Sequence, residues 1–368
     1  MAEVDIGMGK TARRGYHLDE LSLVPTRRTR DAELVDLSWQ IDAYRFELPV
    51  LASPMDSVMS PAQAISLGQA GGLGVLDLEG LWTRHENPDE LLAQLADVTP
   101  ERALSLFRQW YAEPINPDLV TQRVKEMSAG GVYSAGAISP KRVAAMADLL
   151  LKAELDLLVI SGTVTSAEHV SAKPEPLDLK QFVRQLETPV IVGGCASYHA
   201  ALHLMRTGAA GVLVGVDSGH AATSRRVTGL GAGQATALAD VRTARMRHLD
   251  ETGVYVHVIA DGGIGSGADI AKAIAVGADA VMLGSLLANA DSAPGRGLHW
   301  GRSVAHPSLP HGLVLPAPAT GSLEQILFGP AMSADGSTNL MGALRQSMAS
   351  LGYESVKELQ KAEMMVRT

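Results

Sequence analysis

The stretch that decides the fold is VHVIADGGIGSGADIAKAIAVGADAVMLGS, residues 256–285. It contains two short apolar runs that end at small residues, VHVIADGG at 256–263 and AVMLGS at 280–285. Between them, SGADIAKAIAVGA at 266–278 has apolar residues at helical spacing. Continuously apolar runs are typical of strands in a parallel sheet that is covered on both faces. The stretch therefore predicts a strand, a helix and a second parallel strand.

The same unit recurs along the chain. Six further apolar runs lie at 49–57, 72–78, 132–139, 155–162, 189–195 and 211–217. Helical patterns follow most of them, at 60–71, 140–153, 178–187, 197–209 and 233–251. Alternation over eight strands predicts an α/β chain folded as a closed (β/α)8 TIM barrel, with an open doubly wound sheet as the alternative. We expect residues 1–368 to form one barrel domain.

Two segments interrupt the alternation. Residues 79–131 are rich in charge and longer than one helix requires, yet too short for a second domain with its own core. We expect helices and a surface excursion there. Residues 291–333 are irregular and rich in Pro, Gly and His, and a final helical pattern follows at 339–352. A long irregular segment in a compact protein usually covers an active site or forms an interface, so we expect a flap-like region.

Composition excludes several classes of protein. The 31 Lys+Arg and 40 Asp+Glu residues leave a net charge of −9 without a basic stripe, which argues against a nucleic-acid partner. We find neither a signal-peptide core nor an apolar run long enough to span a membrane. One cysteine excludes an intrachain disulfide and a multi-cysteine metal site. We therefore expect a cytoplasmic protein that has no metal site and does not bind membranes.

The ends of the last two predicted strands indicate an anion site. Barrels of this class commonly bind phosphate in the loops after strands seven and eight. Gly262-Gly263 and Gly284-Ser285 stand there, and their unhindered backbone N–H groups suit a monophosphate. Asp261 adds a carboxylate that can accept both hydroxyls of a ribose diol. The alternative is that the glycines only turn the chain and that Asp261 stabilises the turn.

Residues 258–295 resemble the IMP dehydrogenase/GMP reductase barrels. Four further segments are similar to that family in the expected order: LDELSLVPTRRT (18–29), PVLASPMDSVMSPAQAISLGQAGGLGVL (49–76), TPVIVGGCASYHAALHLMRTGAAGVLVG (188–215) and GALRQSMASLGY (342–353). The resemblance implies a role in purine nucleotide metabolism and GMP biosynthesis, and a homo-oligomer, tetramer or octamer. It also implies that residues 79–131 are a shortened insert in place of a regulatory domain.

The resemblance assigns ligand contacts to residues of this chain. Those implied to bind a purine nucleoside monophosphate are Ser53, Met55, Gly219, Asp261, Gly262, Gly263, Gly284 and Ser285. NAD or NADP would lie against Ser161, Gly162 and Thr163, although Ser161 replaces an Asp that the dehydrogenases use toward this cofactor. Nicotinamide contacts are therefore doubtful.

The loop after the sixth predicted strand departs from the family. Ala222 stands where the family enzymes carry the Cys that attacks the purine ring, and a methyl group cannot form that covalent intermediate. Asp217 replaces a glycine of the potassium site, and His220 replaces a Ser that contacts phosphate. We expect the potassium site to be lost. GLHWGRSVAHPSLPHG (297–312) stands in place of the family's G-M-G-S stretch and the Arg-Tyr pair of its mobile flap.

These departures leave three functional hypotheses. The first is a nucleotide-binding paralogue whose hydride-transfer activity is weak or absent. The second is an active NAD(P)-dependent IMP dehydrogenase or GMP reductase with a relocated catalytic group, for which Cys195 and Ser224 are the candidates, although a lone Cys is more often a small buried hydrophobe. The third is a flavin barrel with a similar Asp-Gly-Gly stretch, against which SPMDSV (53–58) and GSLLA (284–288) argue.

Overall fold

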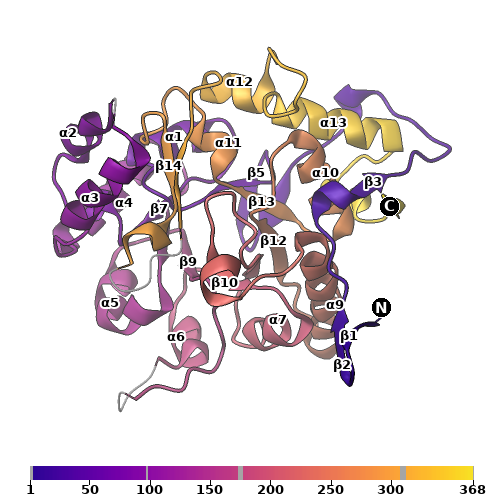
Figure 1. The fold of residues 1–368 in the computed structure, drawn as a ribbon, viewed down its shortest axis with the longest axis horizontal. Coiled ribbons are helices and arrows are strands. Elements are labelled where there is room, and N and C mark those ends of the chain that lie inside the picture. The colour runs from indigo at the N-terminus through magenta and orange to yellow at the C-terminus, as the bar shows by residue number, and fades with distance from the viewer. Residues whose placement is uncertain (1–2, 97, 173–176, 307–311, 368) are drawn as a thin grey trace.

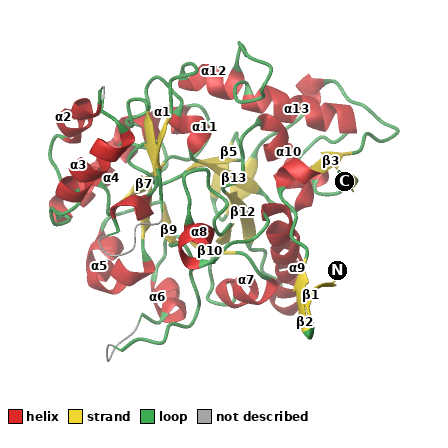
Figure 2. Ribbon diagram, in the orientation of Figure 1, coloured by secondary structure: helices red, strands yellow, loops and turns green. Residues whose placement is uncertain are grey.

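The computed structural model describes residues 3–96, 98–172, 177–306 and 312–367, and its centre is a sheet of eight parallel strands (Figures 1 and 2). The strands are β6 (Val50–Ala52), β7 (Val75–Asp77), β8 (Ala135–Ile138), β9 (Leu157–Ser161), β10 (Val190–Cys195), β11 (Gly211–Val214), β12 (His257–Asp261) and β13 (Ala280–Leu283). They run in the order β6-β13-β12-β11-β10-β9-β8-β7, and a parallel bridge between Leu51 and Leu73 brings β6 back toward β7. The predicted (β/α)8 TIM barrel is confirmed, and the open-sheet alternative is wrong.

Helices surround the strands. They are α1 (Pro61–Gln69), α4 (Pro117–Ala129), α5 (Pro140–Lys152), α6 (Leu179–Gln185), α7 (Tyr198–Met205), α9 (Gln234–Thr252), α10 (Gly267–Val276) and α13 (Leu340–Leu351). The hydroxyls of Ser60, Ser197 and Ser266 cap three of them by accepting from a backbone N–H three residues on. Gly253 and Gly352, at φ of 73° and 78°, end α9 and α13 in the left-handed conformation that glycine favours.

Two buried layers account for the continuously apolar strands. Inside the barrel, side chains such as Leu51, Ile191 and Ile259 pack together with the hairpin of β4 (Trp39–Ile41) and β5 (Tyr44–Phe46). Outside it, alternate strand residues pack against the surrounding helices. Each strand is therefore covered on both faces.

Residues 79–131 form η3 (Leu81–Thr83), α2 (Pro88–Leu92), η4 (Ala93–Leu95), α3 (Pro100–Trp110) and α4. Buried side chains of this segment, among them Leu92, Ala103 and Phe107, belong to the same hydrophobic core as the barrel helices. The Phe107 ring lies 4.4 Å from that of Trp300, measured between centroids. The segment thus packs onto the region that follows the last barrel strand.

That following region is less irregular than its composition predicts. It contains α11 (Ser285–Ala288), β14 (Leu298–Trp300), η5 (Arg302–Ala305), β15 (Val314–Pro316) and α12 (Leu323–Phe328). β14 and β15 pair in antiparallel register. Ser322 and Gln325 form a capping box at the start of α12, a local signal that sequence analysis missed.

The remaining elements lie near the two ends of the chain and in the loop after β11. They are β1 (Glu3–Gly7), β2 (Lys10–Arg13), η1 (Leu18–Glu20), β3 (Leu21–Leu23), η2 (Ala32–Leu34), α8 (Ser224–Thr228), α14 (Val356–Leu359) and β16 (Met364–Val366). β3 pairs with β16, so segments from opposite ends of the sequence lie side by side (Figure 1). Within the described ranges, no helix has the length and apolar character that crossing a bilayer requires.

Candidate functional site

The carboxyl ends of β6 and β13 bring together three of the predicted nucleotide contacts. The Ser53 backbone N–H donates to the Leu283 carbonyl at 2.8 Å, which continues the pairing of the two strands. A Cβ atom added to Gly284 would lie 3.4 Å from Ser53 Oγ and 3.7 Å from Met55 Sδ. Ser53, Met55 and Gly284 therefore meet around one point, with Ser285 next in sequence.

His299, which sequence analysis treated as part of a loop, also belongs to this cluster. Its Nδ1 lies 3.1 Å from Ser57 Oγ and its Nε2 lies 3.3 Å from Ser285 Oγ. Burial, with a smaller effect from His220, lowers the pKa of His299 to about 4. A neutral imidazole donates at one nitrogen and accepts at the other, so His299 can link the two hydroxyls. The feature of the sequence that could have pointed to His299 is the apolar-polar-apolar triplet LHW, residues 298–300.

Asp261 and the two glycines after it form the second half of the predicted nucleotide site. Gly262 and Gly263 have φ of 82° and 74°. A Cβ on Gly262 would lie 2.6 Å from Gly219 N, and one on Gly215 would lie 2.0 Å from the Asp261 carbonyl oxygen. The loop after β11 therefore packs directly on the turn after β12, and only glycine permits that approach.

Burial of the Asp261 carboxyl group raises its pKa to about 6. Gln234 fixes the backbone around it, since its Nε2 donates to the carbonyls of Val214 at 2.7 Å and Asp261 at 3.4 Å. Ser218 in turn donates to Gln234 Oε1 at 2.8 Å. A carboxylate destabilised by burial is stabilised by hydroxyl donors, and a ribose diol supplies two.

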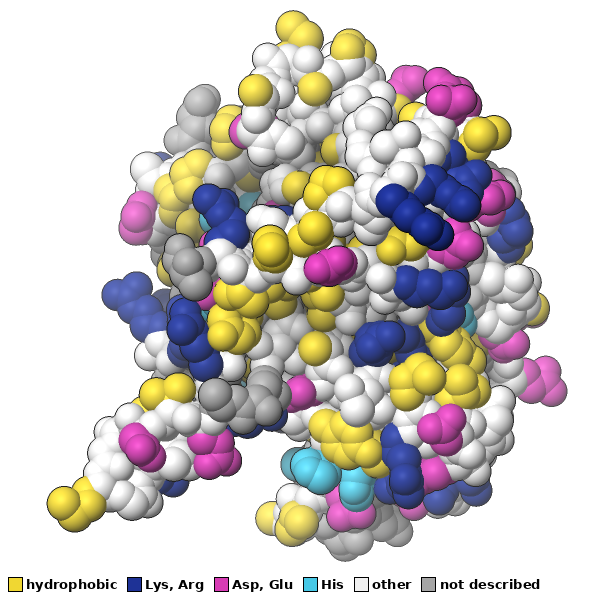
Figure 3. Space-filling view, turned by 90° about the vertical axis from the view of Figure 1, so that its right-hand side faces the viewer, with side chains coloured by type: hydrophobic (Ala, Val, Ile, Leu, Met, Phe, Trp, Pro, Cys, Tyr) yellow, Lys and Arg dark blue, Asp and Glu magenta, His cyan; other side chains and the backbone are white. Residues whose placement is uncertain are grey.

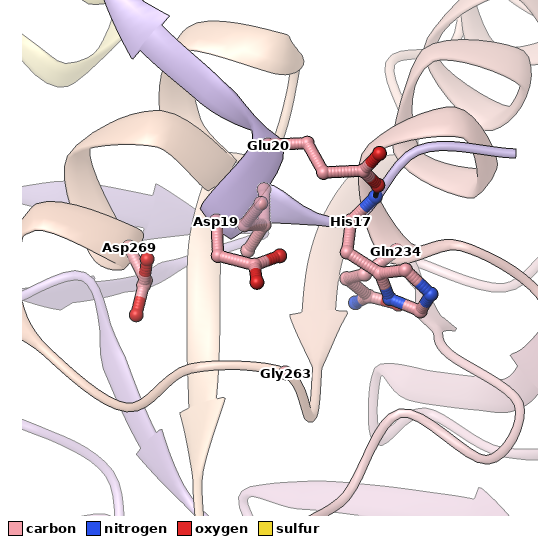
Figure 4. Close-up of a pocket in the computed structure, with 7 residues that line it drawn as sticks. His17, Asp19, Glu20, Gln234, Gly263 and Asp269 are labelled. Atoms are coloured by element: carbon pink, nitrogen blue, oxygen red, sulfur yellow. Dashed lines mark hydrogen bonds between the residues drawn. The ribbon is translucent and has the colours of Figure 1, made fainter. Parts of the chain in front are cut away.

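A cavity of about 340 Å³ borders Gly263 on the side of the N-terminal segment (Figure 4). Its lining includes Asp19, Glu20 and Asp269, together with His17 and Gln234. Three carboxylates repel a phosphate, so this cavity does not suit the phosphate of a nucleotide. Gly284 and Ser285, which are also predicted to contact phosphate, follow β13 and do not line this cavity.

A buried charge network lies at the ends of β7 and β9, and sequence analysis missed it. Arg302 Nε donates to Asp77 Oδ2 at 3.0 Å and Arg302 Nη2 donates to Glu79 Oε1 at 3.1 Å. Burial raises the pKa of Asp77 to about 7, although Arg302 opposes that shift. The available sequence signal was VLDLE at 75–79, where Asp77 ends an apolar run as Asp261 does and Glu79 comes two residues later.

A second buried carboxyl group, that of Asp56, connects this region to α3. The Tyr111 hydroxyl donates to Asp56 Oδ2 at 2.6 Å, and Trp300 Nε1 donates to the Tyr111 oxygen at 3.0 Å. The Leu81 backbone N–H also donates to Asp56 Oδ2, at 2.9 Å. Burial raises the pKa of Asp56 to about 6, and the Tyr111 and Leu81 hydrogen bonds oppose it. The segment 79–131 thus contributes directly to the barrel mouth.

The predicted cofactor residues follow the end of β9. Gly162 N donates to the Gly193 carbonyl and Gly194 N donates to the Gly162 carbonyl, both at 2.9 Å, so the strand pairing continues past β9. Ser161 Oγ accepts from Arg302 Nη1 at 3.2 Å. The Ser161 hydroxyl therefore accepts from Arg302 and keeps its own proton to donate to another group.

The loop after β11 turns at Ala222, which stands where the family enzymes are expected to carry their nucleophilic Cys. Ala222 N donates to the Gly219 carbonyl at 3.0 Å, and Ala222 forms an antiparallel bridge with Gly312. Asp217 has a φ of 61°, and its Oδ2 lies 3.7 Å from Arg225 Nε. Among the residues that the structure describes, no three His, Cys, Asp or Glu side chains gather as a metal site would require.

The two candidate nucleophiles are both buried. Cys195 is 2% exposed, and its Sγ donates to the Leu213 carbonyl at 3.4 Å. Burial raises the pKa of this thiol to about 12, whereas a nucleophilic cysteine needs a lowered pKa. Ser224 begins α8 and is 2% exposed. Neither environment favours nucleophilic attack.

Comparison with known proteins places these features in a family. The model of the IMP dehydrogenase / GMP reductase domain matches residues 15–306. An uncharacterized oxidoreductase of Mycolicibacterium smegmatis is 49% identical, with 99% of each chain covered. An inosine-5′-monophosphate dehydrogenase of Methanocaldococcus jannaschii is 26% identical over 97% of this chain and 93% of its own.

A solved structure agrees with these sequence matches. An IMP dehydrogenase/GMP reductase-like protein from Corynebacterium glutamicum superimposes with a TM-score of 0.93 at 44% identity, covering 99% of this chain and 97% of that one. The fold, the domain match and the relatives agree over most of the sequence. This chain therefore belongs to the IMP dehydrogenase/GMP reductase family.

Proposed function

We propose that this protein binds a purine nucleoside 5′-monophosphate at the carboxyl ends of β12, β13 and β6, and that ordinary hydride transfer is weak or absent. The observation that carries the proposal is the convergence of Ser53, Met55, Gly284 and Ser285 beside the Asp261 turn. Backbone N–H groups and serine hydroxyls there suit a phosphate, and the Asp261 carboxylate suits a ribose diol.

The proposal of weak hydride transfer rests on the loop after β11. Ala222 offers no nucleophile, and the buried Cys195 thiol has a raised pKa that keeps it protonated. Arg302 holds the Ser161 hydroxyl, where the resemblance implies the cofactor. In the cell we expect such a protein to act as a nucleotide sensor or as a cytoplasmic oligomeric partner in purine nucleotide metabolism, including GMP biosynthesis.

The second candidate is an NAD(P)-dependent IMP dehydrogenase or GMP reductase whose catalytic group has moved. One observation favours it: burial raises the pKa values of Asp56 and Asp77 to about 6 and 7, the range in which a carboxyl group can act as an acid or a base at neutral pH. Asp56 follows β6, and Asp77 is the last residue of β7, the neighbouring strand of the barrel.

Calorimetric titration separates these functions. IMP, GMP and XMP are each titrated with and without NAD, beside inosine, which lacks the phosphate, and 2′-deoxy-IMP, which lacks one hydroxyl of the diol. We expect at least one monophosphate to bind, with inosine and 2′-deoxy-IMP much weaker. Binding without NADH formation supports the first function, and turnover supports the second. If none of the three monophosphates binds, the proposal is wrong.

Gly284→Ala gives a matched variant for the phosphate contact. The added methyl group would meet Ser53 Oγ at 3.4 Å, an ordinary contact distance, so we expect the variant to fold. The same methyl group would project into the cluster where the phosphate is proposed to lie. We expect monophosphate affinity to fall at least tenfold while the melting temperature stays close to that of the wild type.

A further inference from the structure

His299 is buried inside the cluster where a phosphate is proposed to bind. Histidine side chains reach the surface elsewhere on the molecule, as the cyan atoms in Figure 3 show, whereas His299 is 3% exposed. A Cβ atom added to Gly284 would lie 3.7 Å from the Cε1 atom of His299 and 3.4 Å from Ser53 Oγ. The imidazole therefore borders the same point as the predicted nucleotide contacts.

The hydrogen bonds of Ser57 determine which ring nitrogen of His299 carries the proton. A serine hydroxyl has one proton and two lone pairs. Ser57 donates its proton to the Trp300 carbonyl at 2.9 Å and accepts from the Trp300 backbone N–H at 3.2 Å. Its remaining lone pair faces His299 Nδ1, which lies 3.1 Å away. Nδ1 must therefore carry a proton, and in the neutral ring Nε2 carries none.

This tautomer determines where the proton of Ser285 points. Because Nε2 of the neutral ring is an acceptor, the Ser285 hydroxyl, at 3.3 Å, donates to it. Ser285 is partly exposed and is one of the predicted phosphate contacts. While its only proton is directed at His299, Ser285 presents lone pairs to a phosphate, whose oxygens also carry lone pairs. The neutral imidazole therefore disfavours a phosphate at Ser285.

We propose that His299 is a positioning residue for the phosphate of the nucleotide, an inference that rests on the proposed function. When a phosphate dianion binds, His299 Nε2 takes up a proton from solvent and donates it in a hydrogen bond to Ser285 Oγ. Ser285 then turns its own proton from His299 to a phosphate oxygen. One proton thus gives the site both a positive charge and a free hydroxyl donor, and the group that this arrangement favours is a phosphate dianion.

The surroundings of His299 allow a ligand to control this proton. Burial, with a smaller effect from His220 in the loop after β11, lowers the pKa of His299 to about 4, and among the described residues no carboxylate contributes to that shift. β15 places Leu315 opposite His299, and Ser285 contacts Nε2, so neither neighbour is charged. An opposite charge nearby typically moves a pKa by roughly 1–3 pH units. A bound dianion should therefore raise the pKa of His299.

Proton uptake during binding tests the proposal. IMP, GMP and XMP are titrated calorimetrically into the wild type and His299→Gln at pH 6.5, in PIPES and in bis-Tris, two buffers with different heats of ionisation. The glutamine amide can donate to Ser285 without taking up a proton. Since the phosphate and Asp261 titrate in both proteins, the wild type should take up about half a proton more than His299→Gln. His199→Gln, which changes an exposed histidine, should match the wild type.

The pH dependence of the affinity gives a second readout. Binding that takes up a proton weakens as the pH rises, so the ratio of the wild-type affinity to that of His299→Gln should fall roughly fivefold or more between pH 6 and pH 8. If His299 only packed the cluster, its replacement would change the affinity by the same factor at both pH values. A constant ratio would therefore overturn the proposal.

NMR of the wild type, labelled with 15N-histidine, observes the ring nitrogens directly and does not depend on the folding of a variant. In the free protein at pH 6, Nδ1 of His299 should carry a proton and Nε2 none. With saturating nucleotide both nitrogens should be protonated. A ring that stays neutral in the complex, or binding without proton uptake, would overturn this proposal alone. If none of the three monophosphates binds, the proposed function is wrong as well.

Discussion

At residue scale, Asp261 is a predicted ligand contact whose buried carboxyl group also destabilises the folded chain when it is ionised. Burial raises the pKa of its carboxyl group to about 6, against an ordinary value of 3.8. Below about pH 4 the carboxyl is protonated in both the folded and unfolded chain, and the cost is absent. As the pH rises through 6, the folded chain must hold a charge that the unfolded chain holds more easily. At neutral pH the ionised Asp261 carboxyl therefore lowers the stability of the folded chain.

We expect Asp261→Asn to raise the free energy of unfolding at pH 7.5 by roughly 1–2 kcal/mol, since one pKa unit corresponds to about 1.4 kcal/mol. The gain should vanish near pH 4. Urea unfolding at both pH values measures it, with Asp291→Asn, an exposed carboxylate away from the site, as the control. A variant less stable than the wild type at pH 7.5 would contradict the argument.

Replacing Asp261 should weaken nucleotide binding, although it should stabilise the folded chain. A hydrogen bond to a charged group contributes roughly 1.5–3 kcal/mol, so Asp261→Ala should weaken IMP or GMP binding about tenfold or more. Calorimetry measures the change, and Asp291→Ala should leave the affinity as it is. Unchanged affinity in a folded Asp261→Ala variant would place the ligand elsewhere.

We expect the wild type to form little NADH from IMP and to consume little NADPH with GMP, because Ala222 cannot supply a nucleophile. Ala222→Cys alone should not restore ordinary rates, since Asp217, His220 and Ser161 also differ from the family and residues that act as a unit are not additive. Steady-state assays of the wild type, Ala222→Cys and Cys195→Ser test this. Robust wild-type turnover that is lost in Cys195→Ser would identify Cys195 as the relocated nucleophile.

At the scale of elements, β14 and the turn after it connect both halves of the barrel mouth. His299 reaches Ser57 and Ser285 on one side, and Arg302 reaches Asp77 and Glu79 on the other. The segment does not pair with the parallel sheet, and it is held by β15, by packing on Phe107 and by these side-chain contacts. The polar contacts can be removed one at a time.

Arg302→Met should destabilise the chain by roughly 3–5 kcal/mol at pH 8, because it leaves the buried Asp77 carboxylate without its cation, while Glu79 keeps its ion pair with Arg142. Without Arg302 the pKa of Asp77 should rise above its present value of about 7, so protonation should reduce the loss at pH 5.5. Urea unfolding at the two pH values measures this. Arg296→Met, which removes an exposed ion pair with Asp89, should change stability by less than about 1 kcal/mol.

Adding Asp77→Asn to Arg302→Met is the corresponding control, because it removes the carboxylate that loses its cation in the single variant. The double variant should recover part of the lost stability and should depend less on pH. An equal loss at pH 5.5 and pH 8 in the single variant would show that packing around Arg302, rather than its charge, holds the segment.

At the scale of the whole molecule, the architecture could be predicted because its signal is local and repeated. Each of the eight strands is an apolar run closed by small or turn residues, and every predicted run contains a barrel strand. Gly262 and Gly263 after β12 carry the same kind of signal, since their φ of 82° and 74° is a backbone conformation that favours glycine. Inference from the residues could therefore predict the fold, and it led to the edge where a phosphate is proposed to bind.

The other half of the mouth depends on contacts between distant parts of the sequence. Arg302 meets Asp77 across 225 positions, and Tyr111 meets Asp56 across 55. An Arg in an irregular segment carries no local sign of its partner, so composition alone could not assign it. The long segment 79–131 likewise gave no sign that it supplies Tyr111, because only the folded chain places α3 beside β15.

The fluorescence of the Trp300 indole should report ligand binding in the unmodified protein. Its Nε1 bonds Tyr111, its ring lies on Phe107, and its sequence neighbour His299 lies in the proposed phosphate cluster. A phosphate dianion near His299 changes the electric field at this fluorophore, so IMP or GMP should shift the tryptophan emission of the wild type. The shift should disappear in Trp300→Phe and persist in Trp39→Phe, whose ring packs with the barrel interior. Ligands could then be found from the tryptophan emission alone, without dye, tracer or coupled reaction, even where the protein catalyses no reaction.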